Sequence, residues 1–132
     1  MKTNLHSLYA TNKTLETNGV WFDISDETGF LVRRFSQDNP EIRSKLAKAF
    51  KPYTYQIQQG TLSAEKDREI TARIFVEACV ADWRGVKDSS GKEIPFSQES
   101  AIEFLKDLPD LLRTLLEHSQ DSKNYREELG NS

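Results

Sequence analysis

The sequence predicts a mainly helical α+β domain, in which an N-terminal β-hairpin packs on a compact bundle of about four to five helices. Three observations support this class. Two short runs near the N-terminus, VWFDI and GFLVRRF, are rich in β-branched and aromatic residues. Beyond them, apolar residues recur at spacings of three or four, which is the period of an amphipathic helix. Capping residues and glycines mark the ends of these periodic segments.

Length and composition fit one cytoplasmic domain. The chain has 132 residues, a net charge of −3 and one cysteine, Cys79. Nucleic-acid-binding domains are usually strongly basic, so this charge argues against general nucleic-acid binding. The sequence has no apolar run close to the ~20 residues that span a bilayer and no apolar signal-peptide core. A single cysteine excludes an internal disulfide and fits a reducing compartment.

The N-terminal third predicts an arm followed by a hairpin. Residues 1–19 are polar and rich in Thr and Asn, and we expect a flexible arm. Residues 20–35 contain the two apolar runs, separated by SDET, which predicts a β-hairpin. An isolated hairpin is marginal in water, so its apolar face must pack on helices. The side chains expected on that face are Trp21 or Phe22, Leu31 and Phe35.

A first helical segment is expected near residues 40–59. Asn39 supplies a capping side chain, and Pro40 suits the first helical position. Pro52 lies inside the apolar pattern, so the helix should kink or restart there. Gly60 is expected to end the segment.

The second helix is expected near residues 63–84 and should lie at the centre of the domain. Ser63 is a favourable N-cap, and acidic residues follow in the opening turns. From Ile70 the chain reads ITARIFVEACVADW, which is apolar on most sides of a helix. Gly85 is expected to end this helix.

Two leucine-rich helices are expected near residues 98–108 and 109–118. Ser97 should cap the first of them. For the second, Asp107 is the expected cap, and Pro109 should lie in its first turn.

The connector and the tail complete the predicted domain of residues 20–118. Between Val86 and Ser100 the chain reads VKDSSGKEIPFSQES, a turn followed by a short apolar piece. We expect Ile94 and Phe96 to fold back over the ends of two helices. Residues 119–132 lose the apolar periodicity and predict a polar C-terminal tail.

No residue pattern in the sequence indicates catalysis. The two histidines and Cys79 do not have the spacing of a zinc site or of a Cys–His nucleophile pair. Phosphate-binding and nucleophile motifs are absent from the sequence as well. Glu77 and Asp82 interrupt the apolar helix. They are five positions apart, which places them about 140° from each other around a helix. This separation favours a polar edge or separate ion pairs over a functional carboxylate pair. We therefore expect no enzyme, no cofactor and no metal.

Charge is distributed unevenly along the chain. Residues 33–51 hold six basic and two acidic residues, whereas residues 97–132 hold four basic and eight acidic ones. Three interpretations remain open: a solvated helix face, a nucleic-acid surface, or head-to-tail joining of identical copies.

Two surfaces are candidates for partner binding. One is the basic helix and the other is the tail, in which Tyr125 and Leu129 are four apart and would share a helical face. The alternative for Tyr125 is that it packs on its own domain. The candidate residues are Arg43, Lys45, Lys48, Lys51, Tyr125, Arg126 and Leu129.

Several segments in order resemble the tail assembly chaperones of phages and prophages with long, non-contractile tails. They are VWFDIS, GFLVRRF, KPY, FVEACVADWRGVKD, GKEIPFSQESA, LPDL and NYREELGNS, which together extend over residues 19–132. The resemblance implies a small, mainly helical, non-enzymatic protein of the host cell cytoplasm that is absent from the mature virion. It implies binding to the tail tape measure protein, recruitment of the tail tube protein, and self-association into rings or spirals. Many such proteins also have a longer, frameshifted form. The alternative is a small nucleic-acid-binding phage regulator that uses residues 41–51.

Overall fold

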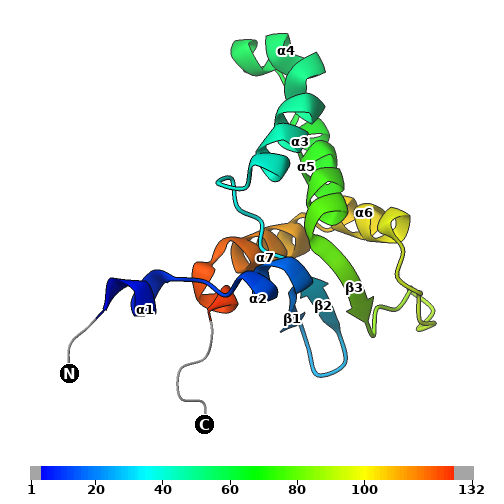
Figure 1. The fold of residues 1–132 in the computed structure, drawn as a ribbon. Coiled ribbons are helices and arrows are strands. Elements are labelled where there is room, and N and C mark those ends of the chain that lie inside the picture. Colours follow the sequence, from blue (N-terminus) through cyan, green and yellow to red (C-terminus); the bar gives the residue numbers. More distant parts are fainter. Residues whose placement is uncertain (1–3, 127–132) are drawn as a thin grey trace.

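The computed structural model describes residues 4–126 and confirms a mainly helical α+β fold with a small antiparallel sheet (Figure 1). Within these residues the chain forms α1 (Leu5–Tyr9), α2 (Lys13–Asn18), β1 (Val20–Asp23), β2 (Gly29–Val32), α3 (Pro40–Phe50), the 3₁₀ turn η1 (Lys51–Tyr53), α4 (Thr54–Gln59), α5 (Ala64–Cys79), β3 (Val80–Arg84), α6 (Gln98–Asp107), α7 (Pro109–Gln120) and the 3₁₀ turn η2 (Ser122–Tyr125). No helix among the described residues is both long and apolar enough to cross a bilayer.

The expected hairpin is present. β1 and β2 pair antiparallel, from Val20 opposite Val32 to Asp23 opposite Gly29. Phe22 is the residue that points inward, and Trp21 lies on the outer face, where it is 39% exposed. The alternative left open for these two aromatic residues is thereby decided. Leu31 was expected on the packed face, but it pairs with Trp21 on the outer face, and its neighbours Phe30 and Val32 are the buried residues of β2.

The sheet has a third strand that the sequence did not indicate. The order is β1-β2-β3, and β3 pairs antiparallel with β2. The expected helix over residues 63–84 therefore ends at Cys79, and its last five residues are extended. The outer edge of β2 has free backbone N–H and C=O groups, and pairing with β3 satisfies the hydrogen bonds of both strands. This gain outweighs the helical preference of so short a segment.

Gly85 consequently ends a strand and not a helix. Its φ is +69°, and a Cβ at this position would lie 1.9 Å from the carbonyl oxygen of Glu27. Only glycine permits both this backbone conformation and this close approach of the loop between β1 and β2.

The core forms where the C-terminal half of α5 meets the sheet, α6 and α7. Phe75 of α5 contacts Phe35 edge to face at 5.6 Å between ring centroids. Trp83 of β3 makes three such contacts, with the rings of Phe30, Phe96 and Phe104. The connector folds back as expected, but its apolar residues cover Trp83: the indole nitrogen donates to the carbonyl of Ile94 at 2.8 Å.

The expected break near Pro52 is confirmed, because α3 passes into the 3₁₀ turn η1 before α4 begins. The N-caps Asn39, Ser63 and Ser97 each accept a backbone hydrogen bond, and Gly60 ends α4 with φ +70°. Figure 1 shows α3, α4 and the first half of α5 extending away from the sheet and α7.

Asp107 does not cap α7. It is the last residue of α6, and the N-cap of α7 is Leu108, whose side chain makes no capping hydrogen bond. Pro109 occupies the first helical position and disfavours helical backbone at the residue before it. Leu108 accordingly has φ −122° and ψ 78°, which moves the boundary one residue past Asp107.

The described parts of both chain ends are more ordered than expected. Residues 1–19 were expected to be a flexible arm, but α1 and α2 form there, capped by the side chains of Asn4 and Asn12. Residues 119–132 were expected to be a polar tail, yet Tyr125 is fully buried. The amide of Asn12 donates to the carbonyl of Tyr125 at 2.7 Å and joins the two ends. Asparagine is common in loops, but here Asn4 and Asn12 cap two short helices.

Candidate partner-binding site

Three of the four predicted basic residues lie on α3, and the fourth, Lys51, begins the 3₁₀ turn η1 that directly follows it. Arg43, Lys48 and Lys51 are exposed, and Lys45 is half-buried. Within the described part of the chain none of the four forms a salt bridge. Ile42, on the opposite side of the helix, is buried against the core. Residues 43–51 thus present four cations without salt bridges in the described chain, while the apolar side of α3 holds the helix to α5.

A shallow apolar groove lies along one side of α3. It has a volume of about 500 Å³. Its apolar lining is Phe35, Leu46, Ala47, Phe50 and Leu116, and its polar edge is Gln37, Arg43, Thr71 and Gln120. We call this set the α3 groove. Its single ionisable residue is Arg43, so an occupant would meet apolar side chains and one cation.

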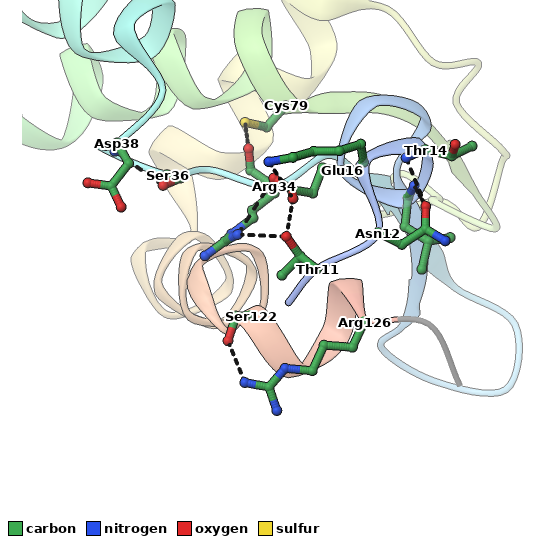
Figure 2. Close-up of polar contacts among 12 residues, drawn as sticks. Thr11, Asn12, Thr14, Glu16, Arg34, Ser36, Asp38, Cys79, Ser122 and Arg126 are labelled. Atoms are coloured by element: carbon green, nitrogen blue, oxygen red, sulfur yellow. Dashed lines mark hydrogen bonds and ion pairs between the residues drawn. The ribbon is translucent and has the colours of Figure 1, made fainter. Parts of the chain in front are cut away.

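A larger polar hollow of about 970 Å³ lies on the side of α3 that carries Lys45, and α2 borders it. Figure 2 shows two of its lining side chains, Arg34 and Glu16, together with Thr11. The Arg34 Nη1 atom lies 3.6 Å from a carboxylate oxygen of Glu16, and the Thr11 hydroxyl donates to the same carboxylate. Burial by itself raises the pKa of Glu16, but the Thr11 hydrogen bond and the charges of Lys13 and Arg34 together lower it. Basic and acidic side chains are mixed here, so the hollow does not select one sign of ligand charge.

Tyr125 is not a surface anchor. Its side chain is fully buried, and its hydroxyl donates to the carbonyl of Val32 at 2.9 Å. Burial raises the pKa of this phenol well above its usual range. The alternative that Tyr125 packs on its own domain is therefore correct, because an aromatic ring with a nearby backbone acceptor is more stable inside than in water.

Arg126 is half-buried and lies on a different part of the molecule from α3. Its guanidinium lies 5.3 Å from the ring centroid of Tyr9, and one of its nitrogens donates to Ser122 Oγ at 3.1 Å. The turn η2 contacts α2 and α7, whereas α3 contacts α5. The two predicted surfaces thus remain separate. Leu129 lies outside the described residues.

The structure adds one apolar surface that sequence reasoning missed. Leu5, Leu8 and Tyr9 of α1 are 70%, 43% and 68% exposed. Their spacing of three and four puts them on one side of the helix, and we call them the α1 face. The same spacing is visible in the sequence, but the polar composition of residues 1–19 concealed it.

The titratable side chains do not form a cluster of the kind that binds metal. Among the described residues no group of three His, Cys, Asp or Glu side chains could hold an ion. Glu77 and Asp82 are exposed and lie on different elements, α5 and β3. Cys79 is buried, which raises the pKa of its thiol to about 12, and its sulfur lies 3.7 Å from the carbonyl oxygen of Arg34. A thiol in this state is a poor nucleophile.

Comparison with known proteins gives one match. A family model described as YdaY prophage protein matches residues 37–131. These residues include the whole of α3, the α3 groove except Phe35, and both leucine-rich helices. No curated protein matches the chain. No solved structure matches it either.

Proposed function

This chain belongs to the YdaY prophage protein family, and from that premise we propose that it is a non-enzymatic tail assembly chaperone. In this role it binds the tail tape measure protein, recruits tail tube subunits, and joins copies of itself in the host cell cytoplasm. It is not part of the mature virion. The prophage family and the resemblance of its segments to tail assembly chaperones support this proposal.

The observation that carries the proposal is the combination of α3 and its groove. Three cations of α3, together with Lys51 just past its end, form no salt bridge in the described chain, and one of them, Arg43, lines the apolar groove. A partner helix with an apolar stripe and acidic flanks suits such a surface. A very long helical protein has many such apolar stripes, and each must be bound by a partner to stay out of water until the tail tube surrounds the protein.

Recovery of partners from a host that produces the phage tests the proposal. The N-terminally tagged protein is expected to retain a very long helical protein and a tail tube subunit, identified by mass spectrometry. The variant Arg43→Glu/Lys51→Glu should lose the long protein, because both substitutions are exposed and invert the charge beside the groove. Recovery of the chain alone would contradict the proposal.

The same four cations support a second candidate, a small nucleic-acid-binding regulator. Phosphate groups would be neutralised by α3, and binding would weaken steeply with salt. The net charge of −3 counts against it. A gel-shift assay with DNA and RNA at low and physiological salt separates the two candidates, since the chaperone requires no retained nucleic acid at the higher concentration.

A further inference from the structure

Among the described residues, the α1 face and the α3 groove are apolar surfaces that the rest of the chain leaves uncovered. The α1 face consists of three large side chains at 43–70% exposure. No residue of α1 lines the groove of its own chain. Figure 1 shows α1 extending from the body on the side of η2.

The α1 helix needs a binding surface to be stable. It has five residues, whereas isolated helices below about 12–15 residues are marginal in water. Its cap, Asn4, satisfies one amide, but its large apolar residues remain 43–70% exposed in the position described. The root of the helix is fixed, because Asn12 bonds to Tyr125 and Arg126 lies against Tyr9. A helix held at its root with an exposed apolar side is arranged to meet another molecule.

The α3 groove is complementary to this helix. Its lining is apolar, as helix-in-groove recognition requires, and residues spaced as Leu5, Leu8 and Tyr9 are the usual anchors. The residues of α1 include no Lys, Arg, Asp or Glu, so the helix itself carries no such charge into the groove. The one cation at the groove, Arg43, can donate to the unpaired carbonyls at the C-terminal end of a docked helix, where the helix dipole is negative.

We propose that the α1 face of one copy docks in the α3 groove of a second copy. The two surfaces differ and lie on separate parts of one chain, so the contact is heterologous and repeats head to tail. This inference deepens the proposed function and rests on the self-association which that proposal includes, and it names the surfaces that join. Attraction between the basic side chains of α3 in one copy and the acidic side chains of the C-terminal helices in the next would orient successive copies. Apart from Arg43 at its polar edge, these charged side chains would remain outside the groove.

Sedimentation velocity of the purified full chain tests the contact. The wild-type protein is expected to associate as its concentration rises. Leu5→Glu/Leu8→Glu removes the α1 face at exposed positions. Ala47→Glu blocks the groove at an exposed position, where Arg43 and Lys51 at i−4 and i+4 support the new carboxylate, so the helix is retained. Each variant should weaken association by at least about tenfold, with an unchanged far-UV circular dichroism spectrum.

Tyr55→Glu is the matched control. Tyr55 on α4 is 71% exposed, comparable with Leu5, but belongs to neither surface. Its association should equal that of the wild-type protein. If Tyr55→Glu weakened association as much as the other variants, exposed apolar surface in general would be responsible and the proposed contact would be wrong.

Mixing the two defective variants gives the sharpest result. The α1-face variant keeps an intact groove, and the Ala47→Glu variant keeps an intact α1 face, so an equimolar mixture should form dimers that do not grow further. A mixture that stays monomeric, or a wild-type protein that stays monomeric at every concentration, overturns the inference. This assay contains no phage partner, so its failure leaves capture of the tape measure protein untouched, and failure of that capture leaves this result standing.

Discussion

The hydroxyl of Tyr125 donates a hydrogen bond to the carbonyl of Val32 at 2.9 Å, and both side chains are fully buried. This bond joins the last turn of the described chain to the middle strand of the sheet. It also determines where the neighbouring residues lie, because Asn12 bonds to the backbone of Tyr125, and Arg126 lies against Tyr9 of α1.

Removing the Tyr125 side chain should therefore destabilise the whole domain. We expect Tyr125→Phe to cost about 1–3 kcal/mol, since the carbonyl of Val32 loses a buried donor. Tyr125→Ala should cost about 3–5 kcal/mol, because the ring volume is lost as well. Urea unfolding measures both values. A Tyr125→Ala protein as stable as wild type would mean that the C-terminal turn does not pack on the sheet.

Ser97 and Asp107 provide a paired test of helix capping. Ser97 Oγ accepts the amide of Ser100 at 3.1 Å, so Ser97→Ala should lower the free energy of unfolding by about 1 kcal/mol. Asp107→Ala should change it by no more than about 0.5 kcal/mol, because Asp107 is exposed and caps no helix. Equal losses for the two variants would restore Asp107 as the cap of α7.

Gly85 and Gly91 both have positive φ, and replacing each by alanine separates the stability cost of the backbone conformation from the cost of a steric clash. The methyl group of Gly91→Ala would have no atom within 4 Å. This variant should therefore lower the free energy of unfolding only by the cost of the left-handed conformation, about 1–2 kcal/mol. Gly85→Ala also brings a methyl group against the backbone of Glu27, so its loss of stability should be larger. Thermal unfolding of both variants compares them, and equal losses would show that the loop between β1 and β2 does not contact Gly85.

His118 should make stability depend on pH in mildly acidic solution. Its ring stacks on Phe22 at 4.1 Å between centroids, and burial lowers its pKa below 6.5, against the opposing charge of Asp121. Because the unfolded chain takes up the proton more readily, stability is fully present above pH 6.5 and is lost as the pH falls through the lower pKa of the folded state.

The control for this effect is His118→Phe, which keeps an aromatic ring on Phe22 but cannot titrate. Melting temperatures between pH 7 and pH 5 should fall for the wild-type protein and fall less for His118→Phe. Identical pH profiles would assign the loss to other groups.

The sequence predicted those features that depend on near neighbours. Asn39, Ser63 and Ser97 each cap a helix a few residues away, and Gly60 ends one, so local residue type was sufficient. The hairpin followed for the same reason, since its two strands are adjacent in the chain.

The features that were missed depend on distant partners. Val80–Arg84 follows an apolar helix without a break, and only the unpaired side of β2, about fifty residues earlier in the chain, makes this segment a strand. Tyr125 lies in a polar tail, and no periodicity reveals that one aromatic residue will find a buried acceptor in Val32. At the candidate site, the sequence placed the cations on one helix, but the groove beside them requires Phe35, Thr71 and Leu116 from three other segments.

Co-expression with the tape measure protein of the same prophage tests the central claim most directly. The readout is the fraction of tape measure protein that stays soluble with the wild-type chain, with Arg43→Glu/Lys51→Glu, and with Lys92→Glu/Lys123→Glu. The third protein carries the same charge change at exposed positions outside α3. We expect a soluble tape measure protein with the wild-type and Lys92→Glu/Lys123→Glu chains, and a largely insoluble one with Arg43→Glu/Lys51→Glu. A tape measure protein that is equally soluble with all three chains, or insoluble with the wild-type chain, would contradict the assignment of α3 as the chaperone surface.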